Sequence, residues 1–149
     1  MIERLPFTLA LASMVENATR WKVGRGRMPV NTDPPYYLLY SIAATRSGAP
    51  FADLNEDADF VYQFTCVSGP DPDRPGSYGI ADQTELMADD LNKAILGRDP
   101  TTGLWLHPIT APGVTVMSRR SDVEAGGTSE PADAIMGYAL RYGFGLTST

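Results

Sequence analysis

Two side chains on which much enzyme and metal chemistry depends are scarce in this sequence of 149 residues, which has one cysteine and one histidine. Cys66 has no second thiol to pair with, so an intramolecular disulfide is excluded and a reducing compartment is expected. Any catalytic triad would have to use His107. It lies in LWLHP, a loop bounded by proline without a nucleophile motif, so we expect a structural role for it beside Trp105.

Long apolar runs and positive charge are also in short supply. No apolar stretch approaches the ~20 residues that cross a bilayer, and Glu3 offsets Arg4 where a secretory signal would be basic. Lysine and arginine number 12 against 18 acidic residues, which gives a formal net charge of -6. This balance argues against a nucleic-acid coat, because tight binding to phosphates needs clustered cations. An acidic surface would instead let DNA slide past without sticking.

The remaining composition fits a single domain. Hydrophobic residues make up 43% of the chain, and a domain of this length buries roughly 70% of the surface that its unfolded chain exposes. Alternating apolar residues indicate strands, and apolar residues three or four positions apart indicate helices. These patterns predict helices at about 6–20 and 78–96 and strands at 36–44, 59–68, 114–117 and 136–146.

The strands at 59–68 and 136–146 have the clearest pattern, since apolar residues occupy every second position in both. The second helix is followed by Gly97, which we expect to close it in the left-handed conformation. Long polar segments connect the elements, at 21–35, 45–58 and 99–113, and 119–131 is expected to be an exposed hairpin arm.

The order of these elements is helix, strand, strand, helix, strand, strand. Two hairpins joined by an amphipathic helix form a mostly antiparallel sheet. The sequence therefore predicts an α+β domain, with two helices packed on one face of a mostly antiparallel four-stranded sheet and long projecting loops.

Candidate sites for chemistry are few. The acidic segment ADLNEDAD, which includes Asp53 and Asp57, resembles the opening of a calcium-binding loop. Ala58 stands where that loop needs a glycine, and Phe64 where it needs a bidentate glutamate. Cys66 shares a strand face with aromatic residues, which is typical of a buried, unreactive thiol. We expect no catalytic residue, no metal site and no cofactor.

The densest basic segment is RWKVGRGR, which runs from Arg20 to Arg27. Arg-Gly pairs beside a tryptophan also occur in nucleic-acid contacts, but in an acidic chain we favour docking against an acidic face of a neighbouring copy. Long polar arms cost conformational entropy unless neighbours order them, so we predict assembly. The predicted interface residues are Arg20, Trp21, Lys22, Arg25, Arg27, Arg46, Arg119, Arg120, Asp122 and Glu124.

In the order and style of its elements the chain resembles the tail terminator family of long-tailed bacteriophages. The resemblance lies in an N-terminal helix followed by four segments, which are PPYYLLYSIAA, DFVYQFTCVS, ADQTELMADDLNKAILG and AIMGYALRYGFGL. Together they cover nearly the whole chain, so the resemblance implies one tail-terminator-like domain at 1–149.

The resemblance implies a structural virion protein and not an enzyme. Such a protein assembles in the host cytoplasm and forms a hexameric ring in the tail or neck of the virion. The ring caps the tail tube, ends its polymerisation and joins it to the head connector.

The implied partners are further copies of the chain, the tail tube protein, the head completion protein of the connector and the tape measure protein. Genomic DNA would pass through the lumen without specific binding, and no membrane is involved. Asp53, Glu56 and Asp57 form the densest acidic loop, so we predict that they line the lumen.

Two other interpretations stay open. The chain could be a head completion, neck or tail tube subunit of the same virion, since these are also small, acidic and ring-forming. It could instead be a small hydrolase or ligand-binding α+β domain that uses His107 or the acidic loop.

Overall fold

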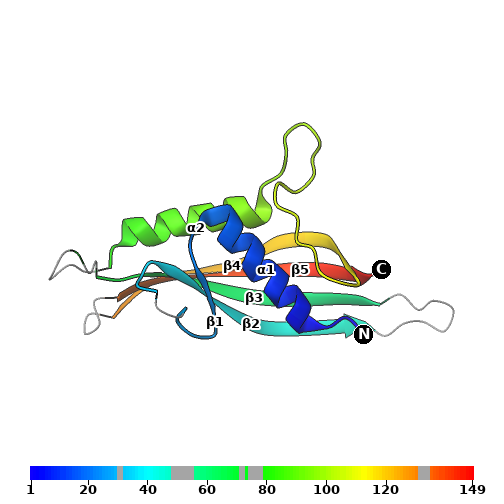
Figure 1. Cartoon of the computed structure of the whole chain (residues 1–149), viewed down its shortest axis with the longest axis horizontal. Coiled ribbons are helices and arrows are strands. Elements are labelled where there is room, and N and C mark those ends of the chain that lie inside the picture. Colours follow the sequence, from blue (N-terminus) through cyan, green and yellow to red (C-terminus); the bar gives the residue numbers. More distant parts are fainter. Residues whose placement is uncertain (30–31, 48–55, 71–72, 74–78, 131–134) are drawn as a thin grey trace.

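The computed structural model describes residues 1–29, 32–47, 56–70, 73, 79–130 and 135–149. In these residues the chain forms one mixed sheet in the strand order β1-β2-β3-β5-β4, with two helices lying across one face of it (Figure 1). The elements are α1 (Arg4–Thr19), β1 (Val23–Arg25), β2 (Tyr36–Ser47), β3 (Asp57–Ser68), α2 (Ala81–Leu96), β4 (Val114–Glu130) and β5 (Ile135–Ser148). The predicted α+β class is confirmed.

Both helices are held on the sheet by apolar residues at helical spacing. In α1 these include Phe7, Leu11 and Val15, and in α2 they include Met87 and Leu91, all fully buried. Each helix therefore presents one apolar stripe to the same face of the sheet.

The C-terminal end of α2 differs from what the sequence predicts, whereas α1 ends close to the predicted residue 20. Arg20 closes α1 with a φ of 71°, and its backbone N–H donates to the Glu16 carbonyl over 3.0 Å. Gly97 closes α2 with a φ of -64°, so its predicted left-handed conformation is wrong. Glycine is needed there for space, because a Cβ atom at Gly97 would lie 2.3 Å from the Lys93 carbonyl oxygen.

Aromatic rings fill the layer between helices and sheet. Phe60, Tyr62 and Phe64 alternate along β3 and are fully buried, as are Tyr142 and Phe144 on the neighbouring β5. Burial of these rings is the largest apolar contribution to the core. The alternation predicted for both strands is confirmed.

The buried hydroxyl and thiol groups of this layer are neutral. The Tyr37 hydroxyl donates to the Met87 carbonyl over 2.7 Å, which ties β2 to α2. Burial raises the pKa of the Cys66 thiol to about 12, so the reactive thiolate form is suppressed at neutral pH.

The sheet contains one strand more than the sequence predicts. β1 lies inside the segment 21–35 that was expected to be a loop, and it pairs in parallel with Tyr37–Leu39 of β2. β2 and β3 also extend into the predicted loop 45–58, up to the pair Ser47 and Asp57.

The predicted arm 119–131 is a strand over most of its length. β4 continues through it to Glu130 and pairs with β5 along its whole course, with register shifts at Val116/Ser118, Ser121/Val123 and Glu124/Gly126. These shifts mark β-bulges, which bend and twist an edge strand.

The opposite face of the sheet carries no helix in the described part of the chain (Figure 1). Gln63, Thr65 and Arg141 on this face are half-buried, and the Arg141 Nε–H donates to the Gln63 Oε1 atom over 3.1 Å. Neither helix of the described residues is long and apolar enough to cross a membrane.

Candidate subunit interface

Three of the predicted interface residues lie together at one edge of the sheet. Lys22, Arg25 and Arg27 are exposed, and we call these three residues the basic edge. Arg20 is also exposed, but it closes α1 and lines a hollow with Asp90 and Lys93 of α2. The chain is fixed at the basic edge by backbone pairing, since the Tyr37 N–H donates to the Lys22 carbonyl over 2.8 Å. β1 and the residues on either side of it therefore present three cations on a backbone that β2 holds in place.

The turn after β1 is shaped by two glycines. Gly26 has a φ of 72°, which glycine adopts without strain, and its N–H donates to the Leu39 carbonyl over 2.9 Å. Gly24 is buried, and a Cβ atom there would lie 2.0 Å from the Arg27 carbonyl oxygen. The two glycines of the GRGR sequence thus shape the turn, and Arg25 between them and Arg27 after them are exposed to solvent.

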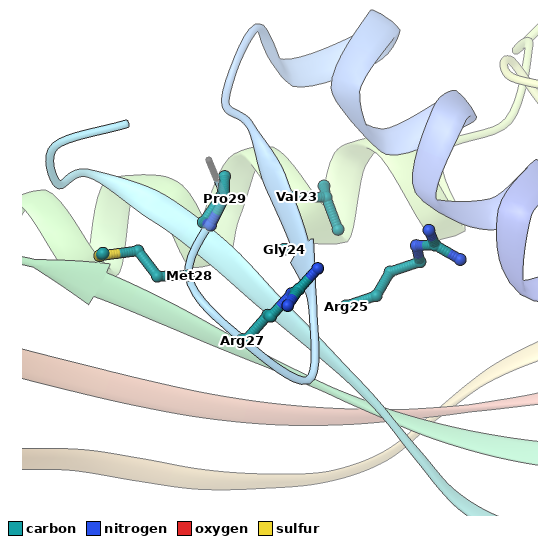
Figure 2. A pocket seen from close by; sticks show the side chains of 6 residues that line it. All are labelled: Val23, Gly24, Arg25, Arg27, Met28 and Pro29. Carbon is teal, nitrogen blue, oxygen red and sulfur yellow. The ribbon is translucent and has the colours of Figure 1, made fainter. Parts of the chain in front are cut away.

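An open hollow of about 520 Å³ lies within this turn, lined by Val23, Gly24, Arg25, Arg27, Met28 and Pro29. Figure 2 shows the Arg25 and Arg27 side chains next to each other, while Met28 points away from them on the far side of the turn. A surface of this kind suits an acidic group on a protein partner.

Trp21 has a different position from its charged neighbours. It is half-buried against the core, and its indole N–H lies 3.4 Å from the Asp90 Oδ2 atom of α2. The Glu16 Oε1 atom accepts the Val23 N–H over 3.0 Å, which fixes the next residues of the same connection. Trp21 thereby anchors the basic edge to both helices.

Acidic side chains gather at the opposite edge of the sheet. Asp122 and Glu124 of β4 are exposed, as are Glu85 and Asp89 of α2, and we call these four residues the acidic edge. Asn92 fixes the side of α2 that faces β4, because its Nδ2–H donates to the Glu124 Oε1 atom over 3.1 Å. Glu85 and Asp89 lie on the same flank, seven and three residues before Asn92.

Tyr138 of β5 completes the packing beneath the acidic edge. Its hydroxyl donates to the Glu124 Oε2 atom over 3.0 Å. The hydrogen bond to Glu124 raises the pKa of Tyr138, and burial and the nearby charge of Glu85 raise it further. The sequence did not reveal Asn92, Tyr138 or Glu85 as parts of a site, since only the folded sheet brings them to Glu124.

Arg119, another predicted interface residue, is buried in the chain's own core at 7% exposure. Its Nη1 and Nη2 atoms donate to the carbonyls of Ile95 and His107 over 3.0 and 2.8 Å. Burial lowers the pKa of this guanidinium to about 10. In this conformation Arg119 joins β4 to the end of α2 and to the loop after it.

Trp105 packs against Arg119 in that loop. The guanidinium of Arg98 lies 4.2 Å from the centre of the indole ring and that of Arg119 lies 4.7 Å from it. Both contacts have cation–π geometry. The sequence predicts that His107 lies beside Trp105, and in the structure the His107 carbonyl accepts a hydrogen bond from Arg119 in the same cluster.

Arg120 lies on the helix-free face of the sheet and forms a bidentate ion pair with Asp59. Its Nη1 and Nη2 atoms lie 3.0 and 2.8 Å from the two carboxylate oxygens. The guanidinium crosses over β5 at Gly143, where a Cβ atom would lie 2.3 Å from its Cζ atom. Glycine at this position is what lets β4 and β3 interact across the strand between them.

We expect Gly143→Ala to displace Arg120 and release Asp59. The pair is almost half exposed, so the cost is about 0.2–1 kcal/mol in the free energy of unfolding. In an Arg120→Ala background the same change should cost nothing, because no guanidinium occupies the space. Urea unfolding of the four proteins of this cycle measures the difference, and equal losses in both backgrounds would contradict the assignment.

The other predicted residues lie near the N-terminus. The Arg46 Nε–H donates to the Ile2 carbonyl over 3.2 Å, and its guanidinium lies 5.3 Å from the centre of the Phe60 ring. Glu56 lies 3.1 Å from the N-terminal amine, and Asp57 begins β3 and is exposed. Asp53 lies outside the described residues.

His107 and Asp90 line a small hollow of about 190 Å³ together with Arg20 and Lys93. Thr19 also lines it, but its hydroxyl donates to the Val15 carbonyl over 2.7 Å. Among the described residues no group of three or more metal-binding side chains is arranged to hold an ion.

No protein-family model matches the sequence, and no curated protein matches it at a significant level.

Proposed function

We propose that this chain is a structural subunit that assembles into a closed ring and caps a bacteriophage tail tube. In this role the ring ends tube polymerisation, joins the tail to the head connector and leaves a lumen for the genome. Besides further copies of the chain, its partners are then the tail tube protein, the head completion protein and the tape measure protein.

The observation that carries the proposal is the length of the sheet relative to its helical layer. β4 has 17 residues and α2 has 16. A strand of that length spans about 50 Å, whereas the helix spans only about 24 Å. The β2–β3 hairpin therefore runs beyond the helices at the end of the sheet that holds both chain termini (Figure 1), and a neighbouring copy can cover the surface that it offers.

Ring closure needs two different surfaces on each subunit. In a cyclic assembly a patch on one copy meets another patch on the next, and the rotation between them closes the ring. The basic and acidic edges are two such surfaces on opposite sides of one rigid sheet.

The lumen is the second part of the proposal. Glu56 and Asp57 lie at the end of the sheet that also holds both chain termini (Figure 1). We propose that this end faces the DNA, since like charges prevent adhesion. A cryo-EM map of the ring that places these residues on the outer rim would contradict the assignment.

Terminator and tube subunits can be told apart by the product that they form. The purified chain should form single rings in electron micrographs, and deleting its gene from the phage should give overlong tails without heads. Long cylinders formed by the chain alone would favour a tail tube subunit. Binding to head proteins without binding to the tail tube would favour a head completion subunit.

A further inference from the structure

The two edges of the sheet carry opposite charge. The basic edge lies beside β1, which is the first strand of the sheet order, and the acidic edge lies at β4, which is the last. Three strands separate them. One copy therefore cannot bring its own two edges together, whereas two copies placed side by side can.

The chain's own contacts leave the charge of both edges largely unpaired. Within the described residues, none of the three cations of the basic edge forms an ion pair. Two carboxylates of the helices, Glu16 and Asp90, are hydrogen-bonded to neutral N–H groups of the same connection. At the acidic edge, Glu124 accepts bonds from the neutral groups of Asn92 and Tyr138.

The shape of β4 favours contact through side chains. Its outer backbone groups could pair with a strand of another copy, but its three register shifts interrupt the regular ladder that such pairing needs. One of these shifts leaves Asp122 without a partner in β5, and Asp122 is exposed at the edge.

We infer that the basic edge of one copy binds the acidic edge of the next, with Arg25 and Arg27 facing Glu85 and Asp122. This inference rests on the proposed ring and names the surfaces that close it. Contacts of this kind give specificity and orientation, and they weaken as ionic strength rises because salt screens exposed charges.

Two charge-reversal variants test the inference. In the first, Arg25→Glu and Arg27→Glu place carboxylates opposite Glu85 and Asp122. In the second, Glu85→Lys and Asp122→Lys place cations opposite Arg25 and Arg27, and Glu124 is left intact because it holds Asn92 and Tyr138. Each variant alone should associate at least about tenfold more weakly than the parent, since like charges then meet at every contact.

An equimolar mixture of the two variants should form rings again. The reversed edge of each variant then meets the reversed edge of the other, and the unchanged edges meet as in the parent. Only alternating rings satisfy every contact, so native mass spectrometry should find equal numbers of both variants and even copy numbers. Recovery in the mixture also shows that both variants are folded.

The possible failures separate the inference from the proposed function. If the parent forms rings and each variant forms them equally well, the edges are not the interface and the inference is wrong. The inference is also wrong if the variants stay apart when mixed. If the parent itself stays monomeric beside its phage partners, the proposed function is wrong as well.

Discussion

Replacing Phe144 by alanine should lower the free energy of unfolding by about 3–5 kcal/mol, because it leaves a cavity at the centre of the core. Phe144 is fully buried, and its ring lies 5.4 Å from that of Phe7 and 6.0 Å from that of Tyr62. These partners come from α1 and β3, so the substitution weakens the contact between the helices and the sheet. Rigid neighbours cannot close the space completely.

Urea unfolding at fixed protein concentration measures this loss, with Met117→Ala as the matched control. Met117 lies on the neighbouring strand β4 and is 65% exposed, so its truncation should change the stability by less than about 0.5 kcal/mol. A loss below about 1 kcal/mol for Phe144→Ala would show that the ring does not occupy the core as described.

The second large effect is expected for Arg119→Ala, at about 2–4 kcal/mol. The substitution leaves the carbonyls of Ile95 and His107 without their donor and uncovers one face of Trp105. Each buried acceptor that loses its partner costs about 1–3 kcal/mol, and removing the buried charge offsets part of this loss.

Arg119→Lys and Arg119→Leu distinguish the possible causes. Lysine keeps the charge but cannot reach both carbonyls with a planar fork, so we expect an intermediate loss. Unfolding measured by urea gives the stability, and the Trp105 fluorescence should shift to the red as water reaches the ring. If Arg119→Leu were as stable as the parent, the two hydrogen bonds would make no net contribution to the free energy of unfolding.

Strong periodicity made most of the fold predictable. The alternation of Phe60, Tyr62 and Phe64 in β3 predicts their shared buried face, and the helical spacing of Met87 and Leu91 in α2 predicts theirs. In these segments burial on one face determines the local structure. The predicted helix at about 78–96 starts earlier than α2, which begins at Ala81, and Ile80 just before it is 56% exposed.

β1 could not be found in this way. It has only three residues, one of which is a glycine, and three residues are too few to show a period. Its pairing depends on Tyr37, which lies 14 residues beyond Val23 in the chain. Contacts over such distances are set by the whole fold and leave no local pattern.

The long course of β4 was missed for a different reason. As an edge strand it is paired on one side only, so most of its residues are exposed and polar. Its bulges also shift the alternation, so that Arg119 and not Ser118 follows Val116 on the helix-covered face. A strict period of two therefore assigns Arg119 to the wrong side.

The same shift in β4 explains why one predicted interface residue, Arg119, is buried while others are exposed. Arg25 and Arg27 are exposed, as are Asp122 and Glu124, whereas Arg119 is enclosed by its own chain. Sequence alone cannot distinguish an exposed arginine that binds a partner from an arginine that packs in the core, because both occur in polar segments. The fold separates them by burial and by the carbonyls within reach.

The most direct test of the proposed assembly is the native mass of the purified chain, measured from low micromolar to high concentration at low ionic strength. A single closed oligomer, with six copies as the expected number, would agree with the proposal. The same mass should persist when more protein is added, because a ring has no free end. A chain that stays monomeric at the highest concentration, even with tail tube and head proteins present, would contradict it.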